Sequence, residues 1–317
     1  MRSLLCLGGA AVAMLPLLAQ SGSDNLVWAP KKKEIPPWTA PMKPHTILRD
    51  VLAKHHSDPN WKDWVVRDGT LDVAYVSMGP GQKTPPRFHP DTREWWVVLD
   101  GQIRFTIEGQ QPFIASKGWM VQVPYRLIYS METVGDKPSV RLEANIANAK
   151  TLYPTSVTPP PMPGFEWLHV RMTQPKGVYD HGNKPYVVYD QIAADIEKKN
   201  PKTKSGQYRF IQEDRAVANF IYGYESSLPP DDPKNRGHYH PECGELWLIM
   251  GGQIAYRIEG VQPFVADTGD IVYTTPFRFH APRFHGPQAA CRLAMNGYPE
   301  IAHLFDTPQA HQEEHIE

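Results

Sequence analysis

The sequence predicts an all-β protein made of two tandem barrels or sandwiches, with a few short helices. Short β-type runs separated by Gly, Pro, Asp and Asn recur in both halves, for example at 71–78 and 95–99, and again at 245–250 and 254–258. Short strands at regular spacing with turn signals are typical of these folds. Residues 101–118 also align without a gap on residues 252–269, with eleven identities in eighteen positions. Two copies of one unit explain this repeat, which has an offset of 151 residues.

The first residues have the layout of a secretory signal peptide. Arg2 precedes an apolar stretch from Leu4 to Leu18, which is too short to span a bilayer comfortably, and small polar residues follow. We expect cleavage after Ala19 and export of a periplasmic or extracellular protein with no membrane anchor; a buried N-terminal helix is the alternative. The formal net charge is −1 and the lysines are scattered apart from 31–33, so we expect no nucleic-acid partner.

Proline and helical patterns set the expected boundaries. Residues 154–164 are rich in proline and cannot pair as a central strand, so they mark a linker. The best helical patterns lie near 45–56 and 189–200. We therefore expect, in chain order, a signal peptide at 1–19, an N-terminal extension at 20–63, a first barrel at 64–150, a linker with a helical segment at 151–207, a second barrel at 208–300 and a tail at 301–317.

A cluster of possible metal ligands lies in the second copy. His238 and His240 are two residues apart, so on a strand they point to the same side. Glu245 is an odd number of residues beyond His240 and would face the opposite way on a straight strand. Pro241 and Gly244 supply the means for a turn that brings the carboxylate back.

Together with His280, this cluster matches a known pattern. H-x-H-x4-E-x6-G, followed by G-x6-P-x3-H, closely resembles the two sequence motifs of the cupin superfamily. The resemblance covers both halves of the chain and implies two double-stranded β-helix (jelly-roll) barrels. It also implies that His238, His240, Glu245 and His280 bind one divalent metal inside the second barrel.

Three imidazoles and a carboxylate suit a divalent transition metal. We favour iron or manganese over copper, nickel or zinc. A polar strand edge without metal is the alternative interpretation.

The first copy departs from the pattern. His89 and Glu94 remain, but Arg87 takes the place of the first histidine, and counting from Gly118 and Pro124 places Ile128 at the last ligand position. A guanidinium cannot bind a cation. We expect a barrel without metal, in which Arg87 stands beside Glu94 and supplies the positive charge instead.

Several other side chains are candidates for roles around the metal. Arg278 is two residues before His280, and strand alternation favours the same side, where it would bind an anionic substrate; a surface arginine is the alternative. Glu242 is a second candidate catalytic residue, and Trp247 and Tyr256 are expected to fill the barrel core. The remaining candidates are Arg236, Tyr239, Cys243, Arg283 and His285, with Asp231 and Asp232 on the preceding loop.

Two cysteines remain after the signal peptide, Cys243 and Cys291. In an exported protein they form a disulfide or stay as two half-buried thiols, and the spacing does not decide between these.

Three functions fit these observations. The resemblance favours a metal-dependent dioxygenase-type oxidoreductase that acts on a small molecule, because two-barrel cupins with one working site include dioxygenases that cleave aromatic rings. A metal-dependent decarboxylase or isomerase of a small acid or sugar is the second, with the metal as Lewis acid. A non-catalytic binder of metal or small molecule is the third. A homodimer is the expected assembly by analogy with the family.

Overall fold

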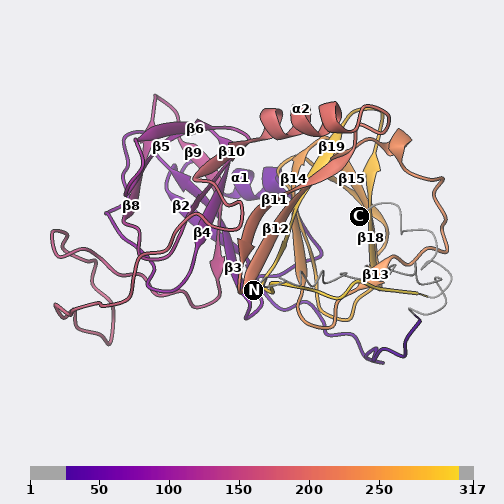
Figure 1. Cartoon of the computed structure of the whole chain (residues 1–317), viewed down its shortest axis with the longest axis horizontal. Helices are drawn as coiled ribbons and strands as arrows, with labels where there is room; N and C mark the ends of the chain where they lie inside the picture. Colours follow the sequence, from indigo (N-terminus) through magenta and orange to yellow (C-terminus); the bar gives the residue numbers. More distant parts are fainter. Residues whose placement is uncertain (1–25, 307–317) are drawn as a thin grey trace, which may run out of the picture.

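The computed structural model describes residues 26–306 and contains two β-barrels side by side (Figure 1). The expected signal peptide at 1–19 and residues 307–317 of the expected tail lie outside these residues. Strands dominate, and the helices are α1 (Leu48–Lys54), α2 (Tyr189–Lys199) and the short 3-10 helix η1 (Glu225–Ser227). The all-β prediction with a few short helices is confirmed. No helix within 26–306 is long and apolar enough to cross a membrane.

The first barrel pairs a six-stranded sheet with a three-stranded one. The large sheet has the order β10-β7-β4-β9-β3-β2 and the small one β6-β5-β8. The strands are β2 (Trp61–Arg67), β3 (Leu71–Met78), β4 (Glu94–Asp100), β5 (Gln102–Ile107), β6 (Phe113–Ser116), β7 (Trp119–Val123), β8 (Tyr129–Val134), β9 (Ser139–Ile146) and β10 (Tyr186–Val188).

The second barrel repeats this plan. Its large sheet has the order β1-β17-β14-β19-β12-β11, and a five-stranded sheet has the order β16-β15-β18-β13-β20. The strands are β1 (His45–Thr46), β11 (Gly206–Glu213), β12 (Ala216–Gly223), β13 (His238–Tyr239), β14 (Glu245–Gly251), β15 (Gln253–Ile258), β16 (Phe264–Asp267), β17 (Ile271–Thr274), β18 (His280–His285), β19 (Ala290–Asn296) and β20 (Leu304–Phe305).

Each barrel receives one short strand from outside its own stretch of sequence. β1, from the N-terminal extension, pairs with β17 of the second barrel, and β10, from the segment between the barrels, pairs with β7 of the first. Asp270 holds the extension in place, since its carboxylate accepts hydrogen bonds from the His45 ring at 2.8 Å and the Leu48 amide at 3.0 Å. The two barrels are therefore joined by more than their linker.

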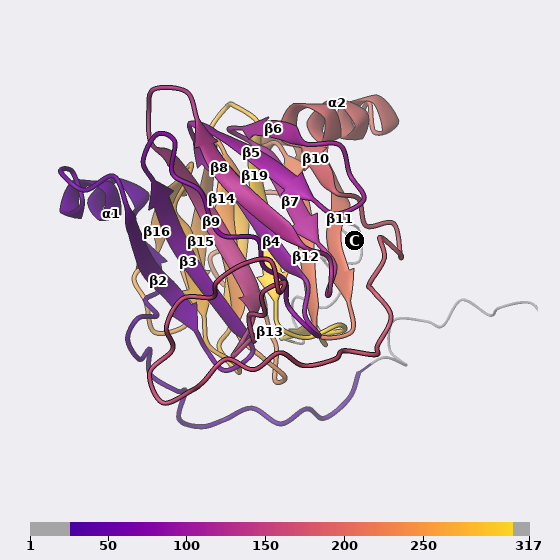
Figure 2. The same cartoon turned by 90° about the vertical axis from the view of Figure 1, so that its left-hand side faces the viewer.

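The two large sheets pack back to back, and strand alternation explains how. Trp96 and Trp247 point into their own barrels, whereas their neighbours Trp95 and Leu246 point into the core between the sheets. The Trp95 indole N–H donates to Met295 Sδ at 3.4 Å across this core. In Figure 2 the first barrel accordingly lies in front of the second. The prediction that Trp247 and Tyr256 fill the barrel core is confirmed, because both are 1% exposed.

Candidate metal centre

The turn expected from the sequence brings the four candidate ligands together. β13 pairs with β18 so that His238 lies directly opposite His280. Gly237 permits this close pairing, because its φ is +72° and a Cβ there would collide with the carbonyl oxygen of His280. The chain then turns between His240 and Glu245, where β14 begins.

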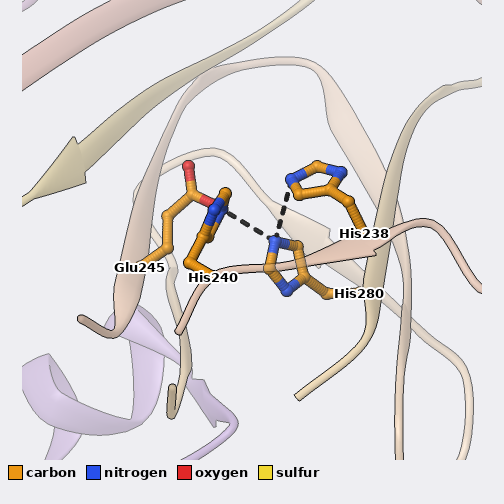
Figure 3. Close-up of side chains that lie close together, drawn as sticks. All are labelled: His238, His240, Glu245 and His280. Carbon is orange, nitrogen blue, oxygen red and sulfur yellow. Dashed lines mark hydrogen bonds and ion pairs between the residues drawn. The ribbon is translucent and has the colours of Figure 1, made fainter. Parts of the chain in front are cut away.

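The four side chains converge inside the second barrel (Figure 3), where one potential ligand atom from each lies within 4.8 Å of the others. Glu245 Oε2 is 3.0 Å from His240 Nε2 and 3.2 Å from His280 Nε2, and His280 Nε2 is 3.1 Å from His238 Nε2. His240, Glu245 and His280 are buried, and His238 is partly exposed. Within 26–306 this is the only group of three or more His, Cys, Asp or Glu side chains with metal-site geometry.

Backbone carbonyls orient two of the imidazoles. His240 Nδ1 lies 2.9 Å from the carbonyl oxygen of Ala302, and His280 Nδ1 lies 2.9 Å from that of Arg278. A carbonyl only accepts, so each Nδ1 carries the proton. Each Nε2 is then left to face the centre, which is the arrangement of metal-binding histidines.

The pKa shifts of His238, His280 and Glu245 favour the neutral imidazoles and the ionised carboxylate that a cation needs, whereas the shift of His240 favours its protonated form. Burial and the neighbouring imidazoles lower the pKa of His238 well below its ordinary value, and burial lowers that of His280. Burial alone would raise the pKa of Glu245, but the hydrogen bonds and charges of His240 and His280 hold it well below its usual range. The pKa of His240 is raised, because its contact with Glu245 outweighs burial. A buried carboxylate among imidazoles therefore suits a divalent metal ion.

In the first barrel a tyrosine stands at the fourth ligand position. Ile107 of β5 pairs with Tyr129, and Ile258, which is 151 residues further on, pairs with His280. Tyr129 is thus the counterpart of His280, and the expectation of Ile128 there was wrong. The expectation came from counting residues after the proline, but Pro124 and Pro276 do not occupy equivalent positions in the two corresponding turns.

The Tyr129 hydroxyl lies among the remaining ligand counterparts. It donates to Glu94, accepts from Arg87 Nε at 2.9 Å, and lies 3.2 Å from His89 Nε2. Arg87 Nη2 is 3.9 Å from Glu94 Oε1. The Arg87 and Tyr129 side chains thus contact the carboxylate that a metal would otherwise bind.

Glu143 extends this network. Glu143 is the counterpart of Ala294 in the second barrel. Trp96 pairs with Glu143 just as Trp247 pairs with Ala294. Burial alone would raise its pKa, but Arg141, Lys62 and Arg87 hold it well below its ordinary value. The first barrel therefore has an internal charge network where the second has the four candidate metal ligands.

Arg278 lies in a different place from the one expected. Its guanidinium donates to the carbonyl oxygen of Pro36 at 2.8 Å and to Thr275 Oγ1 at 3.2 Å, and it lies 3.8 Å from the centre of the Trp38 ring. Strand alternation does not apply to it, because β18 begins only at His280. Arg278 fastens the N-terminal extension to the barrel.

The other candidates lie around the centre or on the surface. Glu242 is exposed in the turn between His240 and Glu245. Arg236 forms ion pairs with Glu259 and Asp306, and Asp231 pairs with Arg257 of β15 and Arg283 of β18. Cys243 and Cys291 are both buried free thiols, so they do not form a disulfide with each other. The Tyr239 hydroxyl donates to the carbonyl oxygen of Pro30, and Arg283 donates to that of Pro229. The last two candidates, His285 and Asp232, are partly exposed.

His303 was missed by sequence reasoning. It precedes β20, which pairs with β13, and its ring centre lies 4.7 Å from those of both His238 and His240. It is exposed, so it lies where the centre opens to solvent. The cupin-like pattern ends before this residue, and no spacing signal in the sequence indicates it.

Fold and site together define a class of protein: two antiparallel β-barrels in tandem, with a buried cluster of three histidines and a glutamate in the second. Comparison with known proteins agrees with this class. Residues 74–144 match the sequence family described as Cupin domain. The matched residues lie in the first barrel, and the second barrel repeats its plan of strands.

Two relatives are informative. A stretch of 78 residues is 32% identical to the oxalate decarboxylase of Bacillus subtilis, but it covers 23% of this chain and only 20% of that protein. The crystal structure of a salicylate 1,2-dioxygenase from Pseudaminobacter salicylatoxidans superposes with a TM-score of 0.60 over 90% of both chains, at 11% identity. A structure of that dioxygenase with gentisate gives 0.60 over 90% of this chain and 87% of the other, at 10% identity. These structural likenesses establish the shared two-barrel fold.

Proposed function

We propose that the protein is an exported, metal-dependent dioxygenase-type oxidoreductase that acts on a small aromatic acid. The observation that carries this proposal is the set His238, His240, Glu245 and His280, whose ligand atoms converge within 4.8 Å in only one of the two barrels. The similarity of the whole fold to a salicylate dioxygenase, which was also solved with gentisate, supports the choice of substrate class. Export is proposed from the composition of residues 1–19.

Different residues around this centre would hold the metal, orient its ligands and transfer protons. The four ligands would hold the ion, and the carbonyls of Ala302 and Arg278 would keep the Nε2 atoms of His240 and His280 directed at it. When bound, iron or manganese supplies a redox-active centre with coordination positions left open beyond four protein ligands. His238 is partly exposed and His303 lies beside it, so substrate would enter from their side. His303 is the group placed to hold or release a proton there.

Dioxygen uptake tests the proposal. Protein loaded anaerobically with iron or manganese is mixed with gentisate, salicylate or catechol in an oxygen electrode, and ring cleavage is followed by absorbance. We expect uptake in proportion to product with at least one substrate. The variant His240→Ala should lose it, and the variant His56→Ala, which removes an exposed histidine, should retain it. Full metal loading without uptake on this panel would contradict the proposal.

A decarboxylase is the second candidate. The 32% identity to an oxalate decarboxylase over 78 residues favours it, although the first barrel here has Arg87 and Tyr129 at two ligand positions. Carbon dioxide release from oxalate, without net dioxygen consumption and with the same dependence on His240, would establish this activity in place of the oxygenase.

A further inference from the structure

The first barrel contains a cavity of about 260 Å³ around the counterparts of the metal ligands. Arg87, His89 and Glu94 form part of its wall, so the cavity reaches the position that corresponds to the metal centre. The rest of the wall consists of Lys62, Trp64, Asp72, Glu143, Asn145, Ile146, Ala149, Thr151 and Tyr153. The size of the cavity suits a small organic molecule. The charge network therefore occupies only part of the barrel interior.

The mouth of this cavity corresponds to the open side of the metal centre. Leu152 bridges to Phe88 in the first barrel, as Leu304 pairs with Tyr239 in the second. Thr151 of the cavity wall is therefore the counterpart of His303. A ligand in the first barrel would enter by the route proposed for substrate in the second.

Most of the carboxylates around the cavity have close cationic partners. Glu143 has two close cationic partners, Lys62 at 2.8 Å and Arg141 at 3.0 Å, whereas Arg87 lies 3.9 Å from both Glu94 and Glu143. Asp72 is paired with Arg67 at 3.2 Å. The lining itself holds two basic side chains, Lys62 and Arg87, and three carboxylates, Asp72, Glu94 and Glu143. Arg67 and Arg141 pair with Asp72 and Glu143 from outside the lining, and with them four basic side chains face three carboxylates. The Arg87 guanidinium donates its Nε–H to Tyr129 but lies 3.9 Å from either carboxylate, so an anion that approaches its Nη groups more closely would pair with it.

One buried amide in the wall has a donor without a partner. Asn145 is 7% exposed, and its Oδ1 accepts a hydrogen bond from the Ile146 amide at 2.7 Å. That bond fixes the orientation of the amide group, and its Nδ2 has no hydrogen-bond partner. A buried donor without an acceptor is costly, so an acceptor supplied by a ligand would stabilise it. Asn145 lines the same cavity as Arg87 and Lys62, so a carboxylate bound there would supply an acceptor of this kind.

We propose that the first barrel is a second, metal-free binding site for a small carboxylate. The carboxylate would interact with Arg87 and Lys62 and accept a hydrogen bond from Asn145 Nδ2. The Trp64 and Tyr153 rings in the wall would contact the apolar part of the ligand. The site would be occupied whether or not the second barrel catalyses an oxygenation.

Calorimetry with benzoate tests this site in the full chain. The variant His240→Ala disables the centre of the second barrel, so benzoate binding that persists in it, at one equivalent per chain, lies elsewhere. We expect benzamide, which has the same ring without the charge, to bind at least about tenfold more weakly. Loss of binding in His240→Ala, or equal binding of benzamide, would overturn the proposal.

Variants locate the site. Within the His240→Ala background, Asn145→Ala and Arg87→Met should each weaken benzoate by about tenfold or more. Arg104→Met removes an arginine of β5 whose side chain is 43% exposed, and it is the matched control that should leave the affinity unchanged. Circular dichroism confirms that each variant is folded. If Arg87→Met does not fold, Lys62→Gln replaces it, since that side chain is 38% exposed. Benzoate affinity that none of the folded cavity variants changes would overturn the proposal.

Discussion

Replacing Arg87 and Tyr129 together by histidine should create a metal site in the first barrel. These two residues face each other across a bridge between strands, as His238 and His280 do in the second barrel. The double variant Arg87→His/Tyr129→His therefore restores the set of three histidines and one glutamate. His89 and Glu94 need no change.

The existing half of that site matches the intact one closely. His89 Nε2 is 2.9 Å from Glu94 Oε2, against 3.0 Å for His240 and Glu245. His89 Nδ1 is 2.7 Å from the carbonyl of Lys150, against 2.9 Å for His240 and Ala302. We therefore expect metal content to rise from about one to about two equivalents per chain. At about 100 times the dissociation constant, the added metal should stabilise the variant by about 2.7 kcal/mol, a rise in Tm on the order of 5–10 °C.

The assay is elemental analysis after loading with manganese and gel filtration, with thermal unfolding in parallel. A His240→Ala background isolates the new site, so the expected change there is from about zero to about one equivalent. A folded variant that binds no metal in this background would refute the assignment of Tyr129 as the counterpart of His280.

Three further predictions concern other parts of the molecule. His303→Ala should leave metal content unchanged and lower kcat/KM by about 10- to 100-fold, and metal loss would contradict a role beside the centre rather than within it. Because the pKa of Glu143 is depressed in the fold, its stabilisation is present above the ordinary value of 4.5 and is lost as the pH falls below it. Glu143→Gln should therefore lower the free energy of unfolding, measured in urea, by about 3 kcal/mol at pH 7 and by less at pH 4. An equal loss at both pH values would contradict this. Arg278→Met should lower the free energy of unfolding by about 1–3 kcal/mol and speed proteolysis within residues 26–44, without altering metal content. Unchanged proteolysis would contradict the role of Arg278 in holding the N-terminal extension.

The sequence predicts that His238, His240 and Glu245 lie close together, because the determinants of this cluster are local. The two-residue spacing of His238 and His240 places them on one face of a strand, and Pro241 and Gly244 indicate the turn before Glu245. The 151-residue repeat likewise predicts the two barrels, since both copies keep the same alternation of inward and outward side chains.

Turn geometry explains where sequence reasoning failed. Arg126 and Phe277 have φ values of +65° and +64°, and they occupy equivalent positions in the turns before β8 and β18. The prolines near them do not correspond, so an alignment on proline shifts the register by one residue and hides Tyr129. The same turn places Arg278 outside the alternation of β18.

Contacts between distant segments lie beyond local patterns. β1 has two residues and pairs with β17, more than 200 positions later. His303 reaches the centre only because the chain returns after β19 to form β20 beside β13. Neither carries a hydrophobic period long enough to be recognised in sequence.

Metal content of the purified protein and two matched variants tests the central claim most directly. We expect about one equivalent of iron or manganese per chain, lost in His240→Ala and retained in its first-barrel counterpart His89→Ala. Two equivalents in the unaltered chain, or metal retained in His240→Ala and lost in His89→Ala, would contradict a single metal centre in the second barrel.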